Sequence, residues 1–167
     1  DRRPYRYFDD FILDEGYAPL AKILAPRTKI SEDSVPAFVK PSYRGIDMSE
    51  YFDVVETDNF VTNLWNSGRW HRLIMARGCY WRKCAFCDVR LPYIGCFRMP
   101  KAEEIVDAMQ ELGTGFHFVD EAMPPSLIEG VCREILRRGF RCEWWGNIRF
   151  DNAFTTELVR LMAKAGC

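Results

Sequence analysis

The sequence predicts an α/β fold with parallel strands, made of about three strand–helix units that follow an irregular connector. From residue 71 onward, short apolar runs alternate with stretches of helical periodicity, so that a strand and a helix succeed each other three times. Before residue 71, prolines interrupt every run, at Pro4, Pro19, Pro26, Pro36 and Pro41. Such an alternating order demands a parallel sheet with right-handed crossovers, and therefore helices on its outer side.

Residues 1–70 are predicted to form the connector. Their pattern is compatible with only one short helix, over residues 18–24. Residues 35–41 are expected to be extended, because proline fixes its own φ and pushes the preceding residue out of the α region. The connector carries more aromatic residues than a solvated linker does, so we expect it to pack along another surface of the protein. These residues are Tyr5, Tyr7, Phe8, Phe11, Tyr51, Phe52, Trp65 and Trp70.

Residues 71–167 are predicted to form the strand–helix units. Strands are expected at residues 72–76, 115–120 and 142–148. Each helix between or after them begins at a residue suited to a first turn, either proline or a threonine N-cap, and ends at a glycine that favours a helix terminus. The helices are expected to run from Pro100 to Gly113, from Pro124 to Gly139 and from Thr155 to Gly166.

Two features of the predicted strands concern which face of the sheet a side chain occupies. Successive side chains of a strand point to opposite faces. Trp144 and Trp145 are therefore expected on opposite faces, so that at most one of them lines a site. His117 falls on the face opposite to Asp120, and we expect it to be a packed core histidine.

Composition excludes several classes of protein. The chain has 23 Lys and Arg against 24 Asp and Glu, a net charge of -1 and 48% hydrophobic residues, which argues against a disordered tail or a generally basic nucleic-acid binder. Its apolar runs are only a few residues long, too short to span a bilayer. We therefore expect a cytoplasmic protein without membrane or nucleic-acid partners. The basic helix edge is expected to be solvated surface, and comprises Arg133, Arg137, Arg138 and Arg141.

Cysteine usage points to metal or redox chemistry in a reducing compartment. Seven cysteines is an odd number, and three of them, Cys79, Cys84 and Cys87, fall within nine positions. Disulfide frameworks are typical of short secreted chains with evenly dispersed cysteines, and that pattern is not present here. The other four cysteines are scattered and are expected to be small buried hydrophobes; they are Cys96, Cys132, Cys142 and Cys167.

The clustered cysteines have the spacing C-x4-C-x2-C and directly follow the first predicted strand. This is the end of a parallel strand at which α/β proteins place their sites. A ferredoxin-type 2Fe-2S cluster is disfavoured, because it needs a fourth cysteine well downstream in an acidic β-rich fold. A structural zinc site completed by Cys96 or His71 remains open. The third interpretation is a 4Fe-4S cluster with three protein ligands, whose fourth iron is open to a small molecule.

The run Gly-Cys-Tyr-Trp-x-x-Cys-x-Phe-Cys at residues 78–87 resembles the cluster motif of the radical S-adenosylmethionine (radical SAM) superfamily. The usual form of that motif is C-x3-C-x2-C, so the first gap here is one residue longer. The residues of this motif are similar to those of the branch in which a cobalamin-binding domain precedes the radical domain. The resemblance continues at residues 118–122, 145–149 and 161–167, and covers residues 72–167.

The resemblance implies a fold and a chemistry. Residues 71–167 would form the N-terminal half of a radical SAM barrel, a partial (βα) barrel, on which the connector of residues 1–70 packs. Because the chain begins at Asp1 and ends at Cys167, we expect it to be a piece of a longer enzyme, inactive alone and able to self-associate through an open sheet edge. The cofactors would be a 4Fe-4S cluster and S-adenosylmethionine, with cobalamin held by a domain outside this chain.

In such enzymes an electron reaches the cluster, and S-adenosylmethionine is cleaved to start radical chemistry or a methyl transfer. The electron donor would be a protein such as flavodoxin or ferredoxin. The substrate, a small molecule or a peptide, is not indicated by the sequence, and no residue is assigned to catalysis. The resemblance assigns iron binding to Cys79, Cys84 and Cys87, contact with the adenine to Phe86, contact with the amino group to Asp120 and Glu121, and contact with the ribose or carboxylate to Asn147 and Arg149.

Each of these assignments has a structural alternative. Asp120 and Glu121 would simply open a loop and stabilise the dipole of the helix that begins at Pro124. Arg149 would form a surface ion pair with Asp151 or Glu143. Trp81, inside the cysteine motif, would either shield a cluster from water or pack in the ordinary way.

Overall fold

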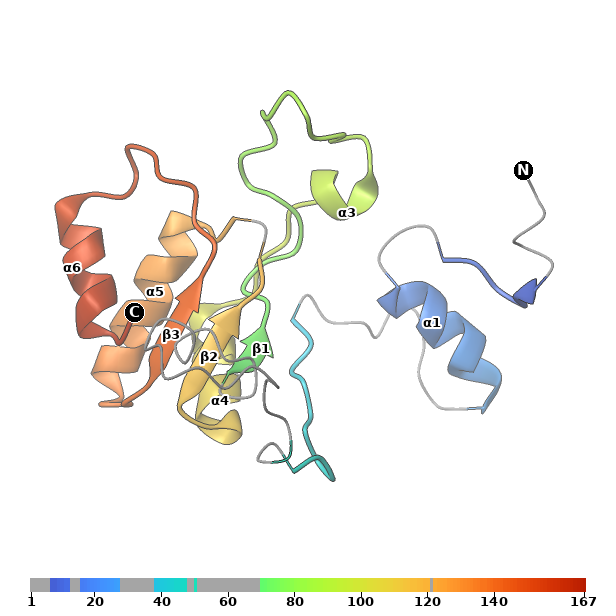
Figure 1. Ribbon diagram of the computed structural model, residues 1–167, viewed down its shortest axis with the longest axis horizontal. Coiled ribbons are helices and arrows are strands. Elements are labelled where there is room, and N and C mark those ends of the chain that lie inside the picture. Colours follow the sequence, from blue (N-terminus) through green and yellow to red (C-terminus); the bar gives the residue numbers. More distant parts are fainter. Residues whose placement is uncertain (1–6, 13–15, 28–37, 48–49, 51–69, 121) are drawn as a thin grey trace.

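The computed structural model describes residues 7–12, 16–27, 38–47, 50, 70–120 and 122–167, and all structural statements concern these residues (Figure 1). Its elements are the helix α1 (Tyr17–Leu24), the 3-10 turn η2 (Ala25–Arg27), β1 (His71–Leu73), α3 (Pro92–Gly95), α4 (Ala102–Leu112), β2 (Gly115–Phe118), α5 (Pro125–Arg137), β3 (Glu143–Gly146) and α6 (Thr156–Lys164). Of the expected extended stretch at residues 35–41, only residues from 38 on are described. Tyr51, Phe52 and Glu121 lie outside the described residues.

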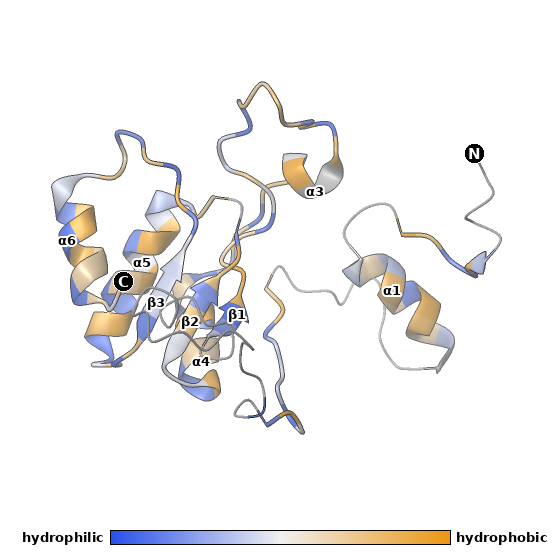
Figure 2. Cartoon of the chain, in the orientation of Figure 1, coloured by the Kyte–Doolittle hydropathy of each residue, from blue (hydrophilic) through white to orange (hydrophobic). Residues whose placement is uncertain are grey.

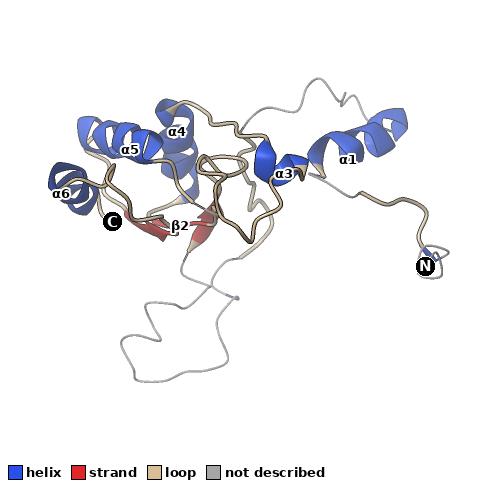
Figure 3. Cartoon of the chain, turned by 90° about the horizontal axis from the view of Figure 1, so that it is seen from above, coloured by secondary structure: helices blue, strands red, loops and turns tan. Residues whose placement is uncertain are grey.

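The strands form a small open sheet in the order β1-β2-β3, with both pairs parallel. This confirms the predicted α/β class and the parallel sheet. The register places Phe116 beside His71 and Trp144, and Phe118 beside Leu73 and Gly146. Strands that are adjacent in both sequence and space, joined by right-handed crossovers, put all their connecting helices on one face of the sheet. Figure 3 shows α4, α5 and α6 on one side of the strands.

The strands are shorter than predicted, because their carboxyl ends leave the ladder for other partners. β1 was expected to reach residue 76 but ends at Leu73. The backbone N–H groups of Met75 and Ala76 donate to the side chain of Asp120 instead of to a neighbouring strand. Beyond β3, the carbonyl of Asn147 accepts from the N–H of Met123, which lies in the loop after β2.

Helix ends follow the predicted signals closely. α4 begins two residues after Pro100, where the N–H of Lys101 donates to the Glu104 carboxylate at 2.8 Å. It ends before Gly113. The φ of Gly113 is +149°, which favours glycine, and a Cβ at this position would stand 2.9 Å from Nε2 of His71. The hydroxyl of Thr155 accepts from the N–H of Leu158 at the start of α6, as an N-cap does.

The hydrophobic core lies between the sheet and its three covering helices. Phe116, Phe118 and Trp144 point into it from the strands and are almost fully buried. Each covering helix carries an apolar and a hydrophilic side (Figure 2). The helices contribute Ile105, Val106, Met109, Leu127, Ile128, Val131, Ile135, Leu158 and Met162. Trp144 also donates from Nε1 to the carbonyl of Ala165, which anchors the end of α6 to β3.

Trp144 and Trp145 lie on opposite faces of the sheet, as predicted: Trp144 is buried under the helices, whereas Trp145 is half-buried on the other face. His117 also lies on this second face, stacked on Trp145 with ring centres 3.6 Å apart and an interplanar angle of 8°. It is therefore not a histidine of the helix-covered core. Burial, and then the positive charge of Arg72, lower the pKa of His117.

The described part of the connector contacts the sheet. The N–H of Arg72 donates to the hydroxyl of Tyr43 at 3.2 Å, and the Tyr43 ring meets the His71 ring edge to face. Phe38 packs against the core. At the other sheet edge, the N–H of Trp144 donates to the carbonyl of Gly166 at 3.0 Å, so the residues after α6 begin to cover β3. None of the described helices has the length and apolarity needed to cross a membrane.

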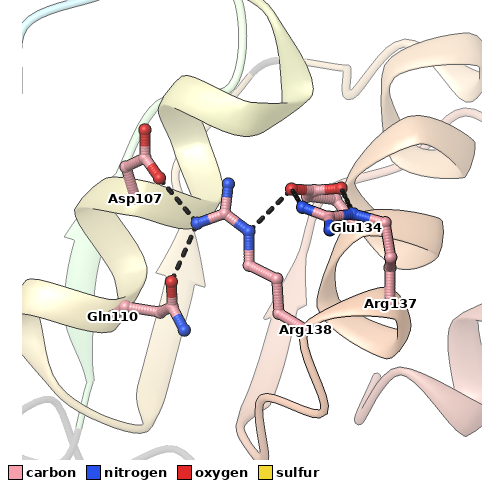
Figure 4. Close-up of polar contacts among 5 residues, drawn as sticks. All are labelled: Asp107, Gln110, Glu134, Arg137 and Arg138. Carbon is pink, nitrogen blue, oxygen red and sulfur yellow. Dashed lines mark hydrogen bonds and ion pairs between the residues drawn. The ribbon is translucent and has the colours of Figure 1, made fainter.

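An ion-pair network joins α4 to α5 (Figure 4). Glu134 is buried, and its carboxylate accepts from Arg137 and Arg138 at 2.6 Å each. Arg138 also reaches Asp107 at 2.6 Å and Gln110 at 2.8 Å on α4. The two arginines lower the pKa of Glu134 to about 2. The prediction of a solvated helix edge is correct for Arg137, whose side chain is 68% exposed. It is wrong for Arg138, whose side chain is only 18% exposed and links two helices.

Candidate functional site

The cysteine motif lies on a closed loop that leaves the carboxyl end of β1. Arg77 and Arg98 exchange two backbone hydrogen bonds, of 2.8 and 3.0 Å, and so form the neck of a loop that we call the cysteine loop, residues 77–98. Inside the neck, the N–H of Cys79 donates to the carbonyl of Ile94. Gly78 has a φ of +72°, and a Cβ there would stand 2.5 Å from the carbonyl oxygen of Cys96. The two sides of the neck close because residue 78 is glycine.

Three thiols are gathered on this loop. Cys79, Cys84 and Cys87 are all half-buried, and the N–H of Cys87 donates to the carbonyl of Cys84 in a tight turn. Burial raises the pKa of the Cys87 thiol, and the neighbouring thiols of Cys84 and Cys79 raise it further because thiolates repel one another. Within the described part of the chain, no three His, Cys, Asp or Glu side chains are arranged to hold a single metal ion.

Asp120 lies just after the carboxyl end of β2, and its side chain binds the backbone that leads from β1 into the cysteine loop. Its side chain is buried, with 2% of the residue exposed. One carboxylate oxygen accepts from the N–H of Met75 at 2.8 Å and the other from the N–H of Ala76 at 2.7 Å. Both oxygens of Asp120 thus accept from backbone N–H groups at the end of β1, and its contact with a cofactor stays a prediction. The carboxylate replaces strand pairing just where β1 ends, and so directs the chain into the loop.

The signal for this role was present in the sequence. Asp120 has the same parity as Phe116 and Phe118, which places it on the buried face of the strand. A buried carboxylate needs hydrogen-bond donors, and backbone N–H groups of the neighbouring strand end are the nearest candidates. Glu121, its predicted companion in the site, lies outside the described residues.

Asn147 ties the ends of β2 and β3 together. Its side-chain amide donates to the carbonyl of Asp120 at 3.3 Å, and its own carbonyl accepts from the N–H of Met123 at 3.1 Å. Gly146, one residue earlier, lies so close to β2 that a Cβ would stand 2.8 Å from the carbonyl oxygen of Phe118. The predicted site residues Asp120 and Asn147 are therefore brought together, through backbone and side-chain contacts.

Arg149 reaches from the loop after β3 to the cysteine loop. Its guanidinium carbon lies 3.3 Å from the centre of the Trp81 ring, and its Nη1 forms an ion pair with Asp151. Asp151 is one of the two partners that the sequence suggested for Arg149. The hydroxyl of Tyr80 also donates to Asp151, at 3.3 Å. Lys83 lies on the Trp81 ring as well, with its ammonium 4.9 Å from the ring centre.

The remaining predicted residues fall into two groups. Phe86 lies between Cys84 and Cys87 and is 89% exposed. Cys96 is exposed, and Cys132 is fully buried in α5, where burial raises its pKa to about 12. The expectation of small buried cysteines is thus confirmed for Cys132 and wrong for Cys96 and Cys167, which are both exposed, whereas Cys142 is half-buried.

Taken together, the carboxyl ends of the three parallel strands carry the thiol cluster, a buried carboxylate, an amide and a guanidinium. This is the edge of a parallel α/β sheet at which ligands usually bind. In comparisons with known proteins, no family model, no curated protein and no solved structure matches this chain.

Proposed function

We propose that this chain carries the cluster-binding part of a radical SAM enzyme, with Cys79, Cys84 and Cys87 binding the irons of a 4Fe-4S cluster. The observation that carries the proposal is the placement of three half-buried thiols on one closed loop at the carboxyl end of the first parallel strand. Sheet and helices agree with a portion of a (βα) barrel, because all covering helices lie on one face and leave the other for the interior.

The donor set fits such a cluster. Thiolates are the usual ligands of iron–sulfur clusters, and three thiolates that bind three different irons need not converge on a single point. Such a cluster, when bound and reduced by the electron donor, would supply the electron for reductive cleavage of S-adenosylmethionine, for radical chemistry or methyl transfer.

The chain's own residues would shape this site in two ways. Asp120 links the ends of β1 and β2 and Asn147 links the ends of β2 and β3, so that the loops that follow these strands start close together. The three thiols are half-buried, so a cluster held by them would be partly shielded from water. The substrate and the electron donor would be separate molecules, and none of the described residues is assigned to binding them.

Anaerobic reconstitution with iron and sulfide tests the proposal. We expect about four irons per chain, a charge-transfer absorbance band, and a change in the electron paramagnetic resonance of the reduced protein when S-adenosylmethionine is added. Serine at position 79, 84 or 87 should abolish the absorbance, whereas Cys142→Ser, outside the loop, should leave it intact. A wild-type chain that takes up no iron under these conditions would refute the proposal.

A structural zinc site is the second candidate, and one observation favours it. The backbone of Cys96 lies against Gly78 at the neck of the loop, and this brings a fourth cysteine next to Cys79. Elemental analysis separates the two functions. One zinc per chain that is retained by the wild type and lost in Cys96→Ser would establish the zinc site, whereas a cluster bound by three cysteines is insensitive to this substitution.

A further inference from the structure

We propose that Arg149 is a positioning residue for the cysteine loop, acting through Trp81, and not a residue that binds the cofactor itself. The guanidinium carbon lies 3.3 Å from the centre of the Trp81 ring, close enough for stacking and cation–π attraction. Arg149 comes from the loop between β3 and α6, and Trp81 from the loop after β1. The contact therefore joins two loops at the carboxyl edge of the sheet that are far apart in sequence.

A carboxylate holds the arginine in this position. Asp151 forms an ion pair with Nη1 of Arg149 and accepts a hydrogen bond from the Tyr80 hydroxyl at 3.3 Å. Its other oxygen accepts from the N–H of Ala153 at 2.9 Å, so the carboxylate is fixed to its own loop. We call these four residues, Tyr80, Trp81, Arg149 and Asp151, the clasp.

The clasp is partly shielded from water. The side chains of Arg149 and Asp151 are 31% and 19% exposed, in contrast to the 89% and 43% of the exposed pair Arg90–Asp88 in the cysteine loop. Partial burial strengthens an ion pair relative to one in open solvent. Because the guanidinium already has a carboxylate on its edge and an indole on its face, its charge is balanced within the protein.

The clasp acts on one part of the cysteine motif, the gap between Cys79 and Cys84. Tyr80 and Trp81 lie between Cys79 and Cys84, in the longer gap of the motif. The turn from Cys84 to Cys87 is held by its own backbone hydrogen bond, whereas this gap contains Arg82, a non-glycine residue with a φ of +50°. That conformation is unfavourable and needs external contacts to persist. Arg82 itself donates from Nη1 to the carbonyl of Gly95 at 2.5 Å, and the clasp holds the two residues before it. Together these contacts set the position of Cys79 relative to the Cys84–Cys87 pair.

Amide hydrogen exchange of the metal-free, 167-residue chain tests the clasp without relying on any metal. In Arg149→Ala and in Trp81→Leu, we expect amides of residues 78–98 to exchange about 3- to 30-fold faster, the range that a lost cation–π contact implies. Exchange in α4, α5 and α6 should not change. Arg149→Lys and Trp81→Phe, which keep a cation and an aromatic ring, should restore part of the protection. In the double variant, Arg149→Ala with Trp81→Leu, amides of residues 78–98 should exchange no faster than in either single variant.

The control is Arg133→Ala, which removes an exposed arginine paired with Glu129 on α5. It should leave exchange in residues 78–98 unchanged. If Arg149→Ala also leaves this segment unchanged, or if its exchange rises equally throughout the chain, the clasp does not position the loop and the inference is wrong.

A second measurement concerns the thiols and rests on the proposed function. In protein reconstituted with iron and sulfide, Arg149→Ala and Trp81→Leu should lose iron to a chelator faster than the wild type, each by a similar factor. Loss at the wild-type rate in both variants would show that the clasp does not act on the thiols. If the wild type binds no iron at all, the proposed function fails, while the exchange experiment still decides whether the clasp exists.

Discussion

Replacing Asp120 by asparagine should destabilise the whole domain, although the change removes no more than a charge and one acceptor. The residue is 2% exposed, and its two oxygens accept from the N–H groups of Met75 and Ala76 at 2.8 and 2.7 Å. In Asp120→Asn one oxygen becomes an NH2 group that itself donates. One buried backbone N–H then faces another donor, and the remaining hydrogen bond loses its charge.

The magnitude follows from these two bonds. A buried donor left without an acceptor costs about 1–3 kcal/mol, and a hydrogen bond to a charged group is worth about 1.5–3 kcal/mol against about 1 kcal/mol for a neutral one. We therefore expect Asp120→Asn to lower the free energy of unfolding by about 2–4 kcal/mol. For a small domain with a total of about 5–15 kcal/mol, this is a large fraction.

Urea unfolding followed by tryptophan fluorescence and circular dichroism measures this loss, since a small domain has a slope of about 1–3 kcal/mol per molar urea. The matched control is Asp88→Asn, which removes the charge of an aspartate that is 43% exposed and bonded to Arg90 on the loop surface. Its effect should be much smaller, because exposed ion pairs contribute little. Should the two variants be destabilised equally, the role assigned to the Asp120 carboxylate is incorrect.

Three further predictions concern pH, backbone geometry and thiol reactivity. Because its arginine partners hold the pKa of Glu134 at about 2, below the ordinary value near 4.3, its contribution to stability is complete above pH 4.3 and is lost as the pH falls toward 2. Glu134→Gln should therefore flatten the acid limb of a stability-against-pH curve, and an unchanged limb would argue against the network. Gly139→Ala, at a φ of +62° with open space around it, should cost about 1–2 kcal/mol. Gly78→Ala should cost clearly more in the same denaturation assay, because its Cβ would also stand 2.5 Å from the Cys96 carbonyl oxygen; equal costs would show that the neck can relax. Iodoacetamide at pH 8 should label the exposed Cys96 readily and the buried Cys132, with a pKa of about 12, only after unfolding, as read by mass spectrometry. Equal labelling rates in the folded protein would contradict the burial of Cys132.

Much of the fold could be predicted from local signals. The helix that ends at Gly113 and the helix capped by Thr155 have the predicted limits within two residues, because caps and glycines act on their own turn. The opposite placement of Trp144 and Trp145 follows from the two-residue period of a strand. The strand ends were predicted less well, since they depend on partners that the local sequence does not name.

The candidate site was predictable in its chemistry and less so in its contacts. The three clustered cysteines are recognisable from spacing alone, because a tight loop forces nearby thiols together. The stacking of His117 on Trp145 was not predicted, and neither was the contact of Arg149 with Trp81. Such contacts depend on which loops end side by side, and that is decided by strand order and register.

By itself, the sequence determined the α/β class, the helices and their ends, and the thiol donors at the end of the first strand. Only the tertiary structure decided that Asp120 binds the N–H groups of Met75 and Ala76, and that Arg149 and Asp151 hold Tyr80 and Trp81. The physical reason is the range of the interactions involved. Caps, turns and strand periodicity act over a few residues, whereas a buried carboxylate or a stacked guanidinium finds its partner only after the parallel strands have brought distant loops to one edge.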